Sequence, residues 1–195
     1  LDGDEIEKEL KTVEWDAEAA EKAGYEHFMI KEIHEQPKAV SDTLNSVVKE
    51  GAIDLSEVGL SEEEIKEISQ IYIVACGSAY HVGVAAQYVM EDLARIPVRV
   101  ELASEFRYRN PILDPKGLVI IISQSGETAD SLAALRESKK QGVKTLGIVN
   151  VIGSSIAREA DNVFYTLAGP EIAVATTKSV QYTADRNLHT GNSVC

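Results

Sequence analysis

The chain has few cysteines and no long apolar run, and each scarcity excludes a class of protein. Two cysteines in 195 residues, Cys76 and Cys195, are too few for a disulfide framework. We expect Cys76, which follows an apolar run, to be a small buried residue. No apolar run approaches the ~20 residues needed to cross a bilayer. The acidic residues 1–4 contain no secretory signal. We therefore expect a cytoplasmic protein with no membrane partner.

Basic residues and nucleotide-binding motifs are also scarce. The chain has 19 Lys and Arg against 32 Asp and Glu, a net charge of −13. Such a surface repels nucleic acid, so no nucleic-acid partner is expected. Neither the three spaced glycines of dinucleotide sites nor a phosphate-loop Gly-Lys-Ser/Thr occurs. The four histidines (His27, His34, His81 and His189) lack metal-site spacing. We therefore expect no metal and no cofactor, and an anionic ligand would need local donors.

The first 69 residues have an acidic, helical character. Residues 20–49 repeat apolar side chains at helical spacing, with an expected interruption at Pro37. Ser61 and Glu64 have the spacing of a capping box, which predicts a second, short helix. No strand pattern precedes Gln70. We interpret residues 1–69 as a linker and helical arm that packs on its own domain or on a partner subunit.

From residue 70 onward, short apolar runs alternate with helical patterns. The runs lie at residues 71–75, 98–102, 118–122, 145–149 and 162–167, with helical patterns at 80–95 and 130–141. Uninterrupted apolar runs indicate strands buried on both faces, and the helices between them indicate parallel βαβ units. The sequence therefore predicts an α/β fold, a doubly wound five-stranded parallel sheet flanked by helices, over residues 70–184. Residues 185–195 form an atypical polar tail.

The strongest candidate for a ligand site is Ser-Gln-Ser-Gly-Glu-Thr at residues 123–128, between an apolar strand and a helix. Ligands of parallel sheets bind at the carboxyl ends of the strands, where helix N-termini offer free amides to anions. Ser123, Ser125 and Thr128 add hydroxyl groups, and Gly126 would let the backbone approach the ligand. The alternative is that these residues only cap the helix. We interpret Glu127 as a partner of the helix dipole or a network anchor rather than a catalytic acid.

Three weaker segments are also candidates. Residues 76–79 (Cys-Gly-Ser-Ala) follow the first strand in the equivalent position. Residues 174–178 resemble a loop that enters a helix, and binding and a plain turn are equally compatible with them. Arg107 and Arg109 could steady a substrate or a neighbouring subunit, but an ordinary ion pair with Glu101 or Glu105 is the simpler interpretation.

The motif at residues 123–128 resembles the signature of sugar-isomerase (SIS) domains. Four further segments resemble one family among them, the glucosamine-6-phosphate synthases (glutamine:fructose-6-phosphate amidotransferases). They are Lys-Glu-Ile-His-Glu-Gln-Pro at residues 31–37, Ala-Cys-Gly-Ser at residues 75–78, Ala-Ser-Glu-Phe-Arg-Tyr-Arg at residues 103–109 and Glu-Ile-Ala-Val-Ala-Thr-Thr-Lys at residues 171–178. The resemblance implies the first SIS domain of the isomerase region, with flavodoxin-like strand order. It also implies binding of fructose 6-phosphate, glucose 6-phosphate or glucosamine 6-phosphate.

The resemblance also assigns roles to particular residues. It implies a phosphosugar site made of Ser78, Ser123, Gln124, Ser125, Thr128, Val174 and Thr176. Ala79 stands where the family often has a serine, so one sugar contact is expected to be missing or replaced by water. The catalytic residues of the family lie in a second SIS half, so none is expected in this chain, which alone should be inactive. The complete enzyme is expected to be a homodimer that aminates fructose 6-phosphate with ammonia from glutamine.

Two other functions stay open from the sequence. A non-catalytic phosphosugar sensor would share the fold, although its usual basic helix-turn-helix is missing from the acidic arm. A simpler sugar-phosphate isomerase with one such domain is the other. The segments at 31–37 and 104–109 favour the synthase.

Overall fold

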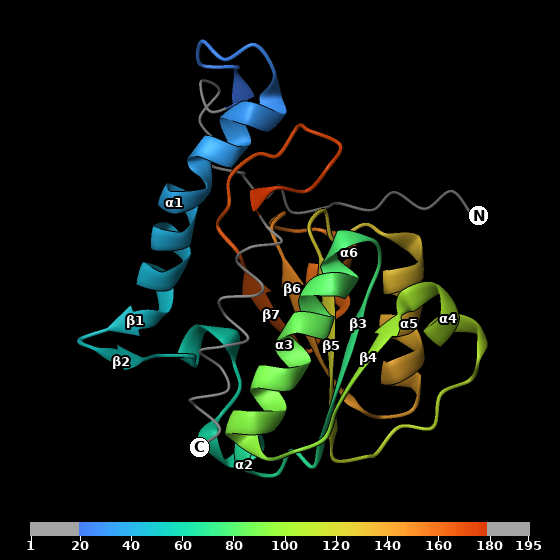
Figure 1. Ribbon diagram of the computed structural model, residues 1–195. Helices are drawn as coiled ribbons and strands as arrows, with labels where there is room; N and C mark the ends of the chain where they lie inside the picture. The colour runs from blue at the N-terminus through green and yellow to red at the C-terminus, as the bar shows by residue number, and fades with distance from the viewer. Residues whose placement is uncertain (1–19, 179–195) are drawn as a thin grey trace, which may run out of the picture.

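A five-stranded parallel sheet organises the computed structural model, which describes residues 20–178 (Figure 1). Across the sheet the strands are β4 (Val98–Leu102), β3 (Gln70–Ala75), β5 (Gly117–Ser123), β6 (Lys144–Val149) and β7 (Asn162–Tyr165). All four pairings are parallel. The first strand of the sheet in sequence therefore lies second in space, which is the flavodoxin-like order. The predicted fold is confirmed.

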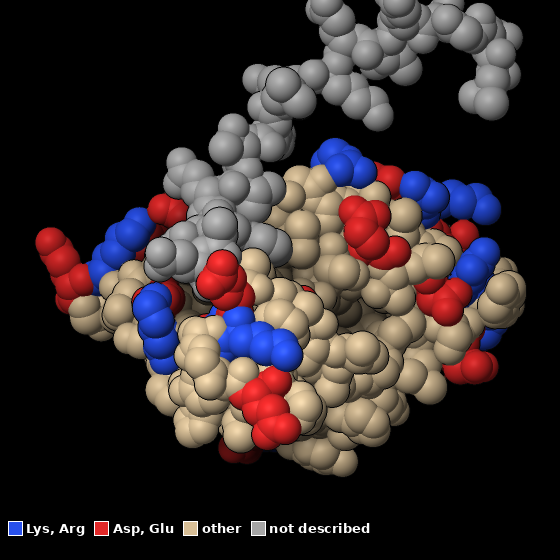
Figure 2. All heavy atoms as spheres, turned by 90° about the horizontal axis from the view of Figure 1, so that it is seen from above, with Lys and Arg blue, Asp and Glu red and all other residues tan. Residues whose placement is uncertain are grey.

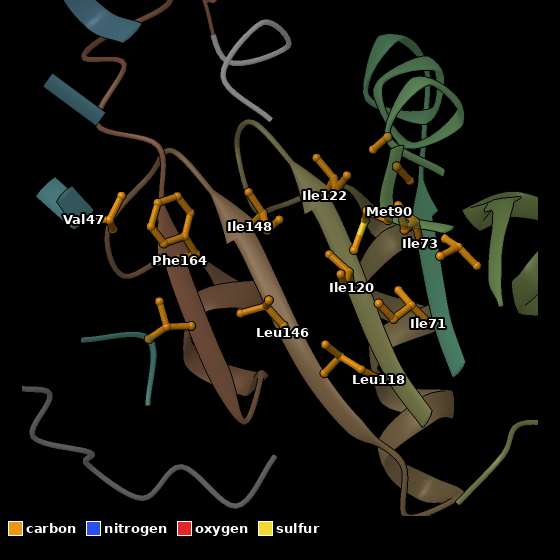
Figure 3. Close-up of a cluster of buried hydrophobic side chains, with 14 residues drawn as sticks. Val47, Ile71, Ile73, Met90, Leu118, Ile120, Ile122, Leu146, Ile148 and Phe164 are labelled. Atoms are coloured by element: carbon orange, nitrogen blue, oxygen red, sulfur yellow. The ribbon is translucent and has the colours of Figure 1, made fainter. Parts of the chain in front are cut away.

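The central strand shows why uninterrupted apolar runs predict this sheet. Every residue of β5 is buried, because helices cover both of its faces. Leu118, Ile120 and Ile122 point to one face, where they pack with Met90 of helix α3 (Ser78–Ala94) (Figure 3). Alternate residues of β5 pack on the other face, which is covered by helices α4 (Ala103–Tyr108), α5 (Ala129–Lys140) and α6 (Ser155–Glu159). The sheet thus holds the helix N-termini of α3 and α5 beside its carboxyl edge.

Helix α1 (Phe28–Val47) forms the arm, and it differs from the sequence prediction at Pro37. The helix begins later than expected and runs through the proline without a break. Pro37 and Ile33 are both exposed, so water can satisfy the Ile33 carbonyl that loses its helical donor. The arm packs on its own chain: the Thr43 hydroxyl donates to the carbonyl of Thr166.

A small hairpin corrects the expectation that no strand precedes Gln70. Strands β1 (Val48–Lys49) and β2 (Ala52–Ile53) pair antiparallel. Glu50 and Gly51 join them with φ of 53° and 80°, the left-handed pair that two-residue hairpin turns require. Two-residue strands are too short to show an alternating pattern, so the sequence carried no signal for them.

The predicted capping box is confirmed. Helix α2 (Glu62–Lys66) follows the short helix η2 (Ser56–Val58). The Glu64 amide donates to Ser61 Oγ over 3.2 Å, and the Ser61 amide donates to Glu64 Oε2 over 2.9 Å. Lys144, the first residue of β6, also donates to Glu64. None of the helices in the described range has the length and apolar character of a membrane span.

Replacing Lys144 with methionine is expected to raise the pKa of Glu64. The Lys144 hydrogen bond is the largest cause that lowers this pKa from its ordinary value of 4.5 to about 2, followed by the Ser61 hydrogen bonds and by the charge of Lys144. Because the folded pKa is lowered, the stabilisation is present above the unfolded pKa of 4.5 and is lost as the pH falls toward 2. Carboxyl-detected NMR titration would measure the shift. Lys66→Met is the control, since Lys66 pairs with Glu62, and an unmoved Glu64 pKa in Lys144→Met would contradict the prediction.

Candidate ligand-binding site

A pocket of about 150 Å³ opens at the carboxyl edge of the sheet. It is bounded by the residues that follow β3, β5, β6 and β7. The lining consists of Cys76, Ser78, Ala79, Ile122, Ser123, Gln124, Ser125, Thr128, Ile148, Val149, Asn150, Thr166 and Thr176. None of these side chains is charged. Seen from above, the surface around the hollow near the middle of the view is mostly uncharged, with charged groups on either side of it (Figure 2).

The loop at residues 123–128 is folded by its own hydroxyl groups. Ser123 is buried, and its Oγ lies 3.1 Å from Thr128 Oγ1 and accepts a 3.1 Å hydrogen bond from the Gly126 amide. The Ser125 hydroxyl accepts from the Glu127 amide over 3.2 Å. These bonds orient the hydroxyl groups before any ligand arrives, which reduces the ordering that binding requires.

Helix capping does not explain this loop. Thr128 is the N-cap residue of α5, yet its side chain makes no capping hydrogen bond. The hydroxyls of Ser123 and Ser125 accept from amides within the loop, before the helix begins. The first amides of α5 therefore keep their donors and the partial positive charge of the helix end.

A second helix N-terminus adds to the same pocket. Gly77 is the N-cap of α3 and brings no side-chain cap, with φ of 57° and ψ of −133°. Ser78, the first residue of α3, is exposed and lines the pocket. The pocket thus combines two uncapped helix starts with hydroxyl groups. Such a donor set binds an anion without a cationic side chain.

The structure shows a further reason for the glycine at position 126, besides the expected approach of the backbone to a ligand. A Cβ at this position would lie 2.1 Å from Ser154 Oγ and 2.5 Å from Ser154 Cβ, and φ is +65°. The glycine is therefore required by the close approach of Ser154, which precedes α6, and by a left-handed backbone. The Gly126 carbonyl accepts from the Ile156 amide over 3.0 Å, which ties the loop to α6.

Six of the seven expected site residues line the pocket: Ser78, Ser123, Gln124, Ser125, Thr128 and Thr176. The structure does not bring the seventh, Val174, to the pocket lining; its side chain is fully exposed. Its contact with a sugar stays a prediction. Cys76 is half-buried at the pocket rather than a core residue, because it follows the last buried residue of β3.

Sequence reasoning missed Asn150 and Thr166. Asn150 directly follows β6, and Thr166 directly follows β7. Their positions at the carboxyl ends of these strands were the signal in the sequence that could have identified them as site residues. Asn150 is buried; its Oδ1 accepts from Thr166 Oγ1 over 3.2 Å and from the Ala168 amide over 2.9 Å. Its Nδ2 donates to the Gly169 carbonyl over 2.7 Å. Asn150 therefore anchors the loop that leaves β7.

The charged residues near the site form hydrogen bonds and ion pairs within the protein. Glu127 accepts from the Ser155 amide over 2.7 Å, and this hydrogen bond lowers the pKa of the Glu127 carboxyl, so it is an anchor to α6 as predicted. Arg109 forms the expected pair with Glu101, and Arg107 pairs with Asp130 rather than Glu105. Within residues 20–178, no group of three His, Cys, Asp or Glu side chains could hold a metal ion.

Comparisons with known proteins point to one group. The model of the SIS domain family matches residues 64–184. The chain is 58% identical over 181 residues to a protein of Clostridium tetani named glutamine–fructose-6-phosphate aminotransferase (isomerizing), with 92% of this chain and 30% of the relative covered. The Clostridium acetobutylicum protein of the same name is 59% identical over 179 residues, with 91% and 29% covered.

A solved structure agrees with these sequence matches. The C-terminal domain of glucosamine-fructose-6-phosphate aminotransferase from Francisella tularensis superposes with a TM-score of 0.84 and 44% identity, over 88% of this chain and 48% of that chain. The chain spans about three tenths of the length of the curated relatives that it matches.

Proposed function

Because the chain belongs to the SIS domain family, as the match over residues 64–184 shows, we propose that its pocket binds a phosphosugar. The resemblance to the glutamine:fructose-6-phosphate amidotransferases that the sequence predicted is confirmed by the relatives named glutamine–fructose-6-phosphate aminotransferase (isomerizing) and by the similar solved structure. We propose that the whole protein makes glucosamine 6-phosphate from fructose 6-phosphate and glutamine. This chain would supply the phosphosugar-binding half of the isomerase region.

One observation carries the proposal: the uncapped N-terminus of α5, beside the hydroxyls of Ser123, Ser125 and Thr128. A phosphate ester carries close to two negative charges and accepts hydrogen bonds in all directions. Free amides and small hydroxyls match that demand without adding bulk. They also suit a protein with a net charge of −13, in which a phosphate meets an unfavourable overall field.

The described residues would bind and orient the substrate. The phosphate would lie against residues 123–128 and Ser78, which leaves the sugar directed toward Asn150 and Thr176. Moving a proton between adjacent sugar carbons needs a general base, and ring opening or imine formation needs an amine. Among residues 20–178, the side chains that line the pocket include no carboxylate, imidazole or ammonium group. We therefore assign catalysis to residues outside this lining and propose that the working enzyme is a homodimer.

Calorimetric titration of the chain tests the proposal. Fructose 6-phosphate and glucose 6-phosphate should bind saturably, whereas glucose without its phosphate should show no measurable heat of binding. Adenosine monophosphate, which carries a phosphate on a larger group, is the control for ligand class. Binding of the nucleotide with no response to either phosphosugar would overturn the proposal.

A further inference from the structure

We propose that Glu32, on helix α1, is a positioning residue for the pocket. It holds residues 171–178 in place so that Thr176 faces the sugar part of the bound ligand. The inference rests on the proposed function, because it assigns the arm a part in phosphosugar binding. It couples two segments that are more than 130 residues apart in the sequence.

The Glu32 carboxylate is buried, and it accepts hydrogen bonds from the loop at residues 171–178. The side chain is only 2% exposed, although it belongs to an arm at the edge of the domain. Its Oε1 accepts from the amides of Ile172 and Ala173, over 2.7 and 3.0 Å. Its Oε2 accepts from the Thr177 hydroxyl over 3.0 Å. Glu32 therefore fixes residues on both sides of the loop.

A second layer of polar contacts closes the same loop. Glu171 accepts from the amides of Thr177 and Lys178, over 2.9 and 2.7 Å. The Lys178 ammonium donates to Glu35 of α1 over 2.9 Å. Gln36 of α1 donates to the Thr177 carbonyl over 2.9 Å. Burial raises the pKa of Glu35, but the hydrogen bonds and charges of Lys178 and Lys31 outweigh it, so the pKa lies below its ordinary value.

Apolar packing does not hold this loop. Residues 171–177 form neither helix nor strand, Ile172 is 47% exposed, and Val174 is fully exposed. A buried carboxylate is costly unless it is fully hydrogen-bonded, and apolar contacts stabilise a loop at lower cost. The carboxylate contributes directional hydrogen bonds, which fix the positions of individual amides and of a hydroxyl in the loop.

Thr176 is the residue of this loop that lines the pocket. It directly precedes Thr177, whose amide, hydroxyl and carbonyl are all bound by Glu171, Glu32 and Gln36. Movement of Thr177 would therefore move Thr176. The donors that we propose for the phosphate lie on other segments, at residues 123–128 and Ser78. Glu32 should affect binding of the sugar and not of the phosphate.

A double-mutant cycle on the full chain tests this inference. Glu32→Gln should weaken glucose 6-phosphate binding about tenfold, the size of one lost hydrogen bond. Thr176→Ala should weaken it by at least as much. If Glu32 acts through Thr176, the double variant should bind no more weakly than Thr176→Ala, within about twofold. Inorganic phosphate, followed by NMR chemical-shift titration, should bind all four proteins equally.

The outcomes separate this inference from the proposed function. If the unaltered chain fails to bind glucose 6-phosphate, the proposed function fails. If it binds and Glu32→Gln binds equally well, or if the two substitutions add independently, the positioning role fails. Glu63→Gln, an exposed carboxylate on α2, is the charge-matched control. If Glu32→Gln does not fold, Thr177→Val carries the test, because it removes a single donor to Glu32 and should show the same cycle with Thr176→Ala.

Discussion

Replacing Gly126 with alanine is expected to destabilise the protein by about 2–5 kcal/mol. A left-handed backbone costs an L-residue about 1–2 kcal/mol, and φ here is +65°. The new Cβ would also meet Ser154 Oγ at 2.1 Å and Ser154 Cβ at 2.5 Å. Both Gly126 and Ser154 are buried between β5 and α6, so overpacking adds about 1–3 kcal/mol. Urea unfolding followed by circular dichroism would measure the loss.

Two matched variants separate the causes. Gly142→Ala introduces a Cβ at φ of +77° with no atom within 4 Å, so it should show only the backbone cost of about 1–2 kcal/mol. Ser154→Gly removes both clashing atoms and a buried hydroxyl that makes no hydrogen bond. In the Gly126→Ala background it should restore part of the stability. If Gly126→Ala and Gly142→Ala lose equal free energies of unfolding, the contact with Ser154 does not contribute to the destabilisation.

The sheet and the main loop were predictable because they depend on local patterns. Strands buried on both faces must be apolar throughout, and β5 and its neighbours have that composition. A hydroxyl-rich segment between such a strand and a helix lies at the carboxyl edge by topology alone. The five strands and the candidate loop at residues 123–128 follow from these two rules, whereas Thr176 was assigned to the site by the resemblance to a known family.

The remaining features depend on tertiary contacts, which leave no local pattern. Pro37 is tolerated because its side of α1 faces solvent, and solvent exposure is decided only when the arm docks. Glu32 belongs to the segment 31–37 that carries the family resemblance, but nothing in the helical pattern distinguishes it as buried from the other acids of the arm. Its burial results from amides about 140 residues away. Asn150 likewise becomes part of the site through its contacts with the loop after β7.

Removing two hydroxyls of the loop, in Ser125→Ala combined with Thr128→Ala, is expected to weaken glucose 6-phosphate binding by about 1–3 kcal/mol. That loss is about 5- to 150-fold in Kd. Both side chains line the pocket, and hydrogen bonds to a charged phosphate are stronger than those between neutral groups. The backbone amides at the start of α5 stay in place, so binding should be reduced rather than abolished. Calorimetric titration would measure the change.

The single variant Thr128→Ala, measured for both stability and ligand binding, distinguishes a phosphate-binding hydroxyl from a helix cap. Loss of a capping hydroxyl costs about 0.5–2 kcal/mol of stability. The Thr128 side chain makes no capping bond, but its hydroxyl lies 3.1 Å from Ser123 Oγ, so Thr128→Ala should lose no more than the free energy of that one hydrogen bond, about 1 kcal/mol. Ser61→Ala is the control, because Ser61 does cap α2 and should lose stability without loss of binding. A Thr128→Ala variant that is destabilised but binds glucose 6-phosphate normally would mean that the hydroxyl supports the helix and leaves the phosphate to other groups.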